Sequence, residues 1–158
     1  LPTLDSYQVF SADYLGNHYA FLLLPDYFSF EVIELSLKSF ATWHDHESFF
    51  ARKKYATSVT GAYYANRLAL TEYLTKIKRQ ASCIVFREIR PSYYAPLGVG
   101  ILRQTSREAF TKKPKVFNTL QEALNHVRTL FSASLDNYLD RSIILKNFKK
   151  QSRLQDFL

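Results

Sequence analysis

The sequence predicts an α+β domain with a mainly antiparallel sheet, a long central helix and two carboxy-terminal helices, followed by a peptide tail. Three observations lead to this prediction: a hairpin pattern near the start, helical spacing over residues 60–79, and a helix-capping pattern at Thr119. The chain has 158 residues, of which 47% are hydrophobic and 16% aromatic, enough for one domain with its own core.

The first third of the chain is predicted to form strands. Residues 7–12 and 18–24 flank a turn at Leu15-Gly16-Asn17, which is typical of a β-hairpin. Residues 28–37 alternate between apolar and polar well enough for a third strand, with a helix as the alternative. Residues 41–56 are polar and aromatic without a period, and we expect an irregular segment there.

Residues 60–79 form the predicted long helix. At about 100° per residue, one broad side is mostly apolar, although Asn66 and Lys76 interrupt it. The apolar positions are Ala62, Ala65, Ala69, Leu70, Tyr73, Leu74 and Ile77, and the opposite side has Tyr64, Arg67, Thr71 and Lys78.

The remaining elements are shorter. We expect a strand over 81–89, a Pro- and Gly-containing connection over 91–98, a strand over 99–104 and a short helix over 106–112. Thr119 and Glu122 form a capping box before a helix that continues to Phe131, and a last helix covers 135–148. The predicted order is therefore β-β-β-α-β-β-α-α.

Charge is unevenly distributed along the chain. Residues 1–50 have one Lys and seven acidic residues, whereas residues 51–115 have fourteen Lys or Arg and three Glu. A basic middle favours a polyanionic partner, usually nucleic acid. The alternative is a solvated basic surface, or one that is paired internally with the acidic third.

Several classes of protein receive no support. The single cysteine, Cys83, lies in an apolar run and is expected to be a buried strand residue without a disulfide. No apolar run is long enough to span a membrane, and no signal peptide, Gly-rich phosphate loop or other cofactor motif is visible. Because the chain lacks Met, we expect a carboxy-terminal fragment of a longer protein whose amino-terminal part is missing. We expect that protein to be cytoplasmic and nucleoid-associated.

The last eight residues match the spacing of peptides that bind ring-shaped sliding clamps. Gln151 is followed by Leu154 and then by the bulky pair Phe157 and Leu158. One tight helical turn would place the three apolar side chains on one side as a plug, with the Gln amide beside it. The alternative is a final turn packed on its own domain. We accordingly divide the chain into a domain over 1–133, a terminal helix over 134–150 and a clamp-binding peptide over 151–158.

Several runs in order resemble the carboxy-terminal domain of the archaeal Nre proteins. The resemblance covers about residues 14–110 and the tail; its runs are Tyr14-Leu15-Gly16-Asn17, Leu23-Leu24-Pro25, Phe30-Glu31, Asp45-His46-Glu47, Arg52-Lys53-Lys54-Tyr55-Ala56, Gly61-Ala62-Tyr63-Tyr64-Ala65-Asn66-Arg67-Leu68-Ala69, Arg79-Gln80-Ala81, Arg87-Glu88-Ile89, Tyr94 and Pro96-Leu97-Gly98-Val99. It implies DNA repair and clamp association but no settled chemical activity. Ala51 and Gly100 depart from the Gly and the Trp expected there.

Basic residues with interleaved aromatic residues are the candidates for binding DNA. Cations can hold phosphates while a Tyr stacks on an unpaired base. The alternative is that each Tyr belongs to the rim of the core and each cation is solvated. The candidates are Arg52, Lys53, Lys54, Tyr55, Tyr64, Arg67, Lys78, Arg79, Arg87 and Arg103, which Arg90 and Arg107 would extend.

Whether the chain is an enzyme stays open at this point. As an alternative to binding alone, Asp45, Glu47 and Glu88 would serve a metal-dependent nuclease as metal or acid–base groups. However, no spaced acidic pair followed by a catalytic Lys is visible, and ion pairing of Asp45 and Glu47 with Arg52 or Arg67 is the competing interpretation. No catalytic residue is assigned.

Overall fold

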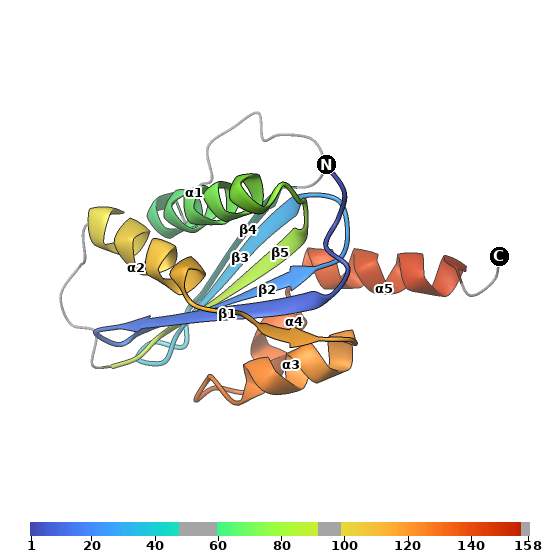
Figure 1. Ribbon diagram of the computed structural model, residues 1–158. Coiled ribbons are helices and arrows are strands. Elements are labelled where there is room, and N and C mark those ends of the chain that lie inside the picture. The colour runs from blue at the N-terminus through green and yellow to red at the C-terminus, as the bar shows by residue number, and fades with distance from the viewer. Residues whose placement is uncertain (48–59, 92–98, 156–158) are drawn as a thin grey trace.

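Within the part of the chain that the structure describes, six strands form one sheet, which is covered by helices on both faces (Figure 1). The computed structural model describes residues 1–47, 60–91 and 99–155. For Thr60, Val99 and residues 152–155 it describes the backbone and not the side chains. The strand order is β4-β3-β5-β2-β1-β6. Helices α1 and α2 cover one face, and α3, α4 and the start of α5 cover the other, so the predicted α+β class is confirmed.

The amino-terminal hairpin is confirmed. Strand β1 (Tyr7–Tyr14) pairs antiparallel with β2 (Asn17–Leu24), and Tyr14 lies opposite Asn17. Leu15 and Gly16 between them have φ values of 46° and 84°. Two successive residues with positive φ match the twist of the two strands, and Gly adopts this conformation without a steric penalty.

The sheet is mainly antiparallel, as predicted, with one parallel pair. Strand β5 (Ser82–Ile89) lies between β2, to which it is antiparallel, and β3 (Ser29–Ser36), to which it is parallel. Strand β4 (Thr42–Glu47) adds an edge next to β3. The prediction of an irregular segment was wrong for β4, because five of its six residues are half-buried and show no alternation. Residues 48–56 of that segment lie outside the described residues.

Helix α1 (Thr60–Ile77) confirms the predicted long helix. Ala62, Ala65, Leu70 and Leu74 are buried in the core beneath the helix, and Ala69 is also buried, as the apolar side requires. Asn66, which interrupts that side, is also fully buried. Its amide donates a hydrogen bond of 2.7 Å to Ser106 Oγ of α2, so the polar group joins the two helices.

Helix α2 (Val99–Thr111) replaces the predicted strand over 99–104 and includes most of the short helix predicted after it. The strand prediction was wrong because consecutive apolar residues hide a helical period, in which Leu102, Thr105, Ser106 and Ala109 are the buried positions. The Ser106 hydroxyl donates to the carbonyl of Leu102 at 2.9 Å, which satisfies it inside the helix.

The carboxy-terminal third contains a short strand and three helices. Strand β6 (Lys115–Phe117), which was not predicted, pairs with β1 at the sheet edge. Helix α3 (Leu120–Arg128) begins at the predicted Thr119 cap, whose hydroxyl accepts from the Glu122 amide at 3.2 Å. The predicted last helix is divided into α4 (Asp136–Leu139) and α5 (Ile143–Gln155). None of the helices in the described ranges is long and apolar enough to cross a membrane.

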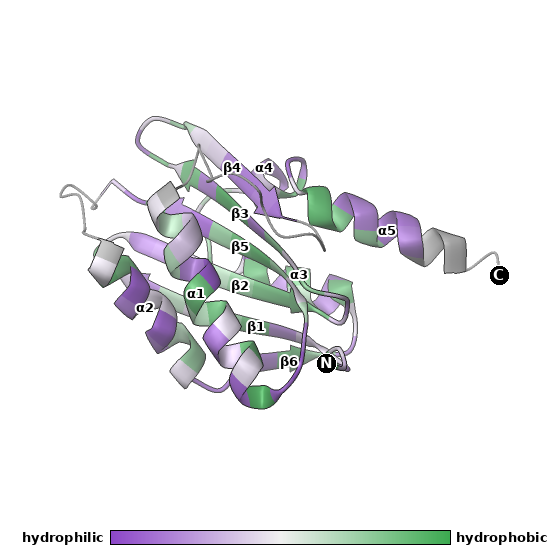
Figure 2. Ribbon diagram, turned by 90° about the horizontal axis from the view of Figure 1, so that it is seen from above, coloured by the Kyte–Doolittle hydropathy of each residue, from purple (hydrophilic) through white to green (hydrophobic). Residues whose placement is uncertain are grey.

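Two hydrophobic cores lie on the two faces of the sheet. In Figure 2 the central strand β2 is coloured mainly as hydrophobic. The core under α1 and α2 includes Phe10, Phe21, Phe30 and Tyr63, and the core under α3 to α5 includes Phe86 and Tyr138. Cys83 is fully buried in the first core, as predicted. Burial alone raises the pKa of its thiol well above the ordinary value.

We expect the thiol of Cys83 to be unreactive in the folded protein. A raised pKa leaves almost no thiolate at neutral or mildly alkaline pH, and the thiolate is the reactive species. Titration with a chromogenic disulfide reagent should give negligible labelling in native buffer and one thiol per chain in denaturant. Rapid, complete labelling without denaturant would show that the strand is not buried as described.

Candidate functional site

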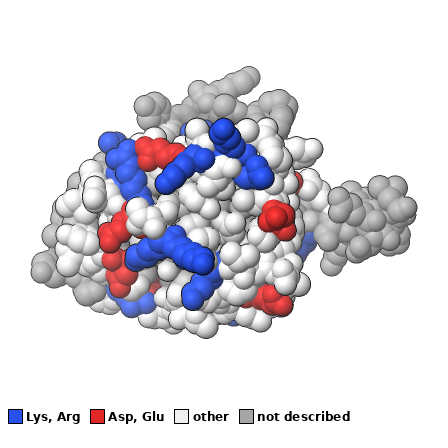
Figure 3. Space-filling model, in the orientation of Figure 1, with Lys and Arg blue, Asp and Glu red and all other residues white. Residues whose placement is uncertain are grey.

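Exposed basic side chains gather on α1, α2 and the segments that follow them. We name this set the basic face: Lys76, Lys78, Arg79, Arg103, Arg107, Lys112, Lys113 and Lys115. Against these eight cations, the described residues of the same segments expose two acidic side chains, Glu72 and Glu108, a difference of six charges. Figure 3 shows Lys and Arg recurring over this side, with Asp and Glu between them. Three of the predicted DNA-binding residues, Lys78, Arg79 and Arg103, belong to this set.

Arg67 and Tyr64, also predicted to bind DNA, lie at the rim of the core. Arg67 is half-buried; its Nε donates to the carboxylate of Glu47, and its guanidinium lies 5.6 Å from the Phe28 ring centroid. Tyr64 is half-buried and packs edge-on against Tyr63 with 5.2 Å between ring centroids. The ion pair of Glu47 with Arg67 is the alternative that the sequence left open, and the structure supports it.

Arg87 must be removed from the predicted DNA-binding set, because it is only 7% exposed. It donates from Nη1 to Glu34 Oε1 and from Nε to Asn17 Oδ1, both at 3.0 Å. Its guanidinium also lies 5.5 Å from the ring centroid of Tyr19. Burial raises the pKa of Glu34, and Arg87 opposes that rise by favouring the carboxylate. Arg87 therefore neutralises a buried acid instead of facing a ligand.

The four remaining DNA-binding candidates, Arg52, Lys53, Lys54 and Tyr55, lie outside the described residues.

The three carboxylates of the nuclease alternative do not meet. Asp45 and Glu47 are aligned with Val32 and Phe30, which belong to the core under α1. Glu88 follows Ile84 and Phe86 at a period of two, and these residues belong to the core on the opposite face. The sheet therefore separates Glu88 from the other two, and no group of three potential metal ligands occurs among the described residues. The nuclease alternative, which needed Asp45, Glu47 and Glu88 in one site, is therefore wrong.

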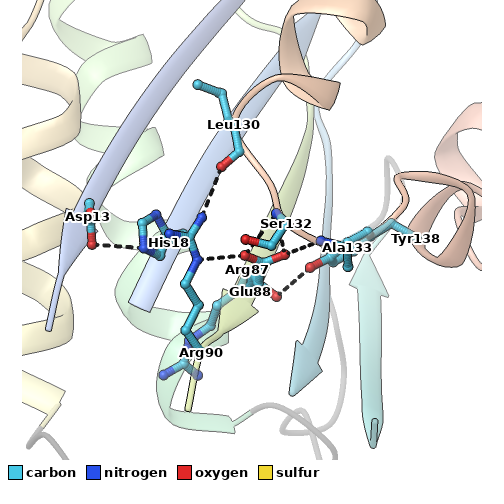
Figure 4. A network of polar contacts seen from close by, with 9 residues as sticks. All are labelled: Asp13, His18, Arg87, Glu88, Arg90, Leu130, Ser132, Ala133 and Tyr138. Atoms are coloured by element: carbon cyan, nitrogen blue, oxygen red, sulfur yellow. Dashed lines mark hydrogen bonds and ion pairs between the residues drawn. The ribbon is translucent and has the colours of Figure 1, made fainter. Parts of the chain in front are cut away.

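Glu88 instead holds the segment between α3 and α4 (Figure 4). Its fully buried carboxylate accepts hydrogen bonds from the Ser132 amide at 3.0 Å and the Ala133 amide at 2.9 Å. Arg90 Nε donates to the same carboxylate at 2.8 Å. Three donors compensate the cost of burying this charge, so its role is structural.

A second buried glutamate, Glu31, fixes the start of α5. Its carboxylate accepts from Ser142 Oγ at 2.6 Å and from the Ile143 amide at 2.7 Å, and the Nε2 atom of His44 lies 2.7 Å away. An anion at a helix amino terminus satisfies free N–H groups and favours the helix dipole. Glu31 therefore attaches the terminal helix to the sheet.

Beyond its first turns, α5 extends away from the sheet (Figures 1 and 2). Ile144 and Leu145 are buried, and Phe148 packs edge-on against Tyr7 with 6.2 Å between ring centroids. Gln151, the first residue of the predicted clamp peptide, is helical and exposed. The side chains of Leu154, Phe157 and Leu158 lie outside the described residues.

The sequence patterns did not identify Glu31 and Glu34, or the structural role of Glu88. Glu31 and Glu34 lie in β3, which is otherwise apolar apart from terminal Ser residues, and Glu88 lies in the apolar strand β5. Charged residues are almost never fully buried unless paired, so an acid inside an apolar strand indicates a partner. Composition did not identify those partners, because Arg87 and Ser142 are distant in sequence from Glu34 and Glu31.

Comparison with known proteins identifies relatives along the whole chain. The family model described as "Archaeal Nre, C-terminal" matches residues 47–157, and "Archaeal Nre, N-terminal" matches residues 1–44. The DNA repair proteins NreA and NreB of Archaeoglobus fulgidus are each 34% identical, over 98% and 99% of this chain and 39% and 41% of their own lengths. The DNA repair protein NreA of Haloferax volcanii is 28% identical over 84% of this chain and 34% of its own length. No solved structure gives a significant match.

The two matched regions meet inside one sheet. The amino-terminal match ends and the carboxy-terminal match begins within β4, while β5 of the second region lies between β3 and β2 of the first. This chain covers about two fifths of the length of the Archaeoglobus relatives. Within this chain, strands of both regions are hydrogen-bonded in one sheet, and residues of both regions contribute to each hydrophobic core.

Replacing Glu31 with Ala should lower the free energy of unfolding by about 2–4 kcal/mol, because the Ser142 hydroxyl and the Ile143 amide lose their acceptor. Chemical denaturation measures this change, and hydrogen exchange should show faster exchange at the start of α5. Asp136→Asn, which removes an exposed pair with Arg128, is the control and should change stability by less than about 1 kcal/mol. Equal effects of the two substitutions would contradict the anchoring role.

Proposed function

The chain belongs to the archaeal Nre family, and we propose that it acts in DNA repair by binding DNA through the basic face while residues 151–158 recruit it to the sliding clamp. The relatives described above are named DNA repair proteins, which supports a role in DNA repair. The excess of six exposed cations on α1, α2 and the following segments is the observation that supports DNA as the ligand.

Burial of acidic residues strengthens this argument. Glu31, Glu34 and Glu47 are 0%, 6% and 5% exposed, so these charges from the acidic first third do not face the solvent. Only one cation of the basic face, Arg107, forms an ion pair with a described residue. Most of the basic face is therefore free to contact phosphates, which supply most of the affinity of non-specific DNA binding.

The geometry of α5 supports the clamp proposal. The helix is attached to the sheet at its start by Glu31 and carries its other end away from the two cores. Lys146, Lys149 and Lys150 are exposed on it, beside Gln151. A peptide at the end of a protruding helix is accessible to a partner, and neighbouring cations suit an acidic rim.

DNA affinity should fall as salt rises. The log–log slope should be about −0.7 for each single-strand phosphate contacted, because bound cations release counterions from the DNA. Fluorescence anisotropy with a labelled oligonucleotide at several salt concentrations measures this slope. No binding at low salt, or binding that salt does not change, would contradict the proposal.

Reversing charge on the basic face should weaken binding and flatten the slope. The double substitution Lys78→Glu and Arg103→Glu removes two exposed cations, and each lost phosphate contact should reduce the slope by about 0.7. The matched control, Lys149→Glu with Lys150→Glu, makes the same charge change on α5. If both variants lose the same affinity, net charge and not the basic face determines binding.

Deleting residues 151–158 should abolish binding to the sliding clamp and leave the melting temperature nearly unchanged. The physical reason is that the deleted residues follow the buried part of α5. Calorimetry with the purified clamp, together with thermal unfolding, measures both quantities, and Phe157→Ala should reproduce the loss of binding. A large loss of stability would instead indicate a tail packed on its own domain.

A further inference from the structure

A groove between α1 and α2 lies within the basic face. Its cavity volume is about 490 Å³, and its lining residues are Ala69, Glu72, Tyr73, Lys76, Ile77, Arg107, Phe110 and Thr111. That volume falls in the range of roughly 300–1,000 Å³ typical of small-ligand sites. Neither the sequence patterns nor the family resemblance pointed to these residues as a group.

The floor of the groove is aromatic. The rings of Tyr73 and Phe110 stack with 5.1 Å between centroids and an interplanar angle of 22°. Phe10, buried in β1, supports them from below, with its centroid 4.9 Å from Tyr73 and 4.7 Å from Phe110. Tyr73 is fixed further by a hydrogen bond of 3.1 Å to Gln8. Both groove-lining rings are half-buried, so the floor is rigid and partly accessible.

The rim of the groove is positive. Arg107 donates to both carboxylate oxygens of Glu72, at 2.6 and 2.9 Å, across the two helices. This hydrogen bonding lowers the pKa of Glu72 and keeps the acid ionised and paired. Lys76 lines the groove and has no acidic partner among the described residues. The net charge at the rim therefore suits an anion.

We propose that this groove binds an unpaired base of single-stranded DNA, with Lys76 on an adjoining phosphate. The inference deepens the proposed function and rests on it for the identity of the polymer. An apolar, aromatic recess bordered by cations is the combination that single-strand binding uses, since every base has an apolar face and every linkage a charge.

The same features disfavour a peptide helix as the occupant. Helix-in-groove recognition uses anchors at i, i+3, i+4 and i+7 along an extended apolar surface. On the α1 side, the recess extends only from Ala69 to Ile77, and Glu72 with Arg107 forms a polar pair across it. A compact recess with a charged rim fits one base better than a helix of several turns.

Two comparisons test the base-binding groove by fluorescence anisotropy. In the first, the unaltered chain is titrated with labelled oligothymidylate and with an abasic strand of equal length and charge. The abasic strand should bind about 5- to 100-fold more weakly, the cost of losing one stacked base. This comparison does not depend on the folding of any variant.

In the second comparison, Thr111→Trp fills the groove from its exposed rim, and Thr75→Trp places the same side chain on an exposed α1 position outside it. The Thr111→Trp variant should bind oligothymidylate about 5- to 100-fold more weakly than the unaltered chain and should bind the abasic strand with unchanged affinity. The Thr75→Trp variant should bind both strands with unchanged affinity. Equal affinity for both strands, with no effect of Thr111→Trp, would contradict base binding in the groove but would still be consistent with DNA binding through the charges of the basic face. Absence of binding to either strand would overturn the proposed function itself.

Discussion

Four buried glutamates constrain this domain. Glu31, Glu34, Glu47 and Glu88 lie on β3, β4 and β5 and are at most 6% exposed. A buried carboxylate is tolerated only when donors compensate the water it has lost, and removing one partner of a buried ion pair commonly costs about 3–5 kcal/mol. Each acid accordingly fixes another part of the chain. Glu31 holds the start of α5, and Glu34 holds Arg87 of β5. Glu47 holds Arg67 of α1, and Glu88 holds the segment before α4. The sheet and its covering helices are connected through these contacts.

The same constraint separates the charges of the molecule. Three of the seven acidic residues in the first third, Glu31, Glu34 and Glu47, are buried. Arg87 and Arg67 pair with the last two, while the cations of the basic face stay at the surface. The formal net charge of +7 therefore does not show how unevenly the exposed charges are distributed. The internal pairing considered as an alternative applies to Arg67 and Arg87. The cations of the basic face stay exposed, and the aromatic groove between α1 and α2 lies among them.

Sequence reasoning predicted elements whose signals are local. The β1–β2 turn, the length of α1 and the Thr119 cap depend on residues within a few positions of one another. It failed where distant contacts decide the structure. Edge strand β4 is paired on one side only, α2 begins with consecutive apolar residues, and the groove joins side chains from two helices. Arg87 was assigned to the surface because nothing in its immediate neighbourhood identifies Glu34 and Asn17 as partners.

The central claim is that DNA and the clamp use separate parts of the chain, so both can be bound together. Hydrogen exchange measured with DNA alone, with clamp alone and with both tests it most directly. We expect DNA to protect the helices of the basic face, clamp to protect the end of α5, and the mixture to show both protections at once. If clamp removes the protection that DNA gives, or if DNA protects α5 and leaves α1 and α2 unchanged, the account is contradicted.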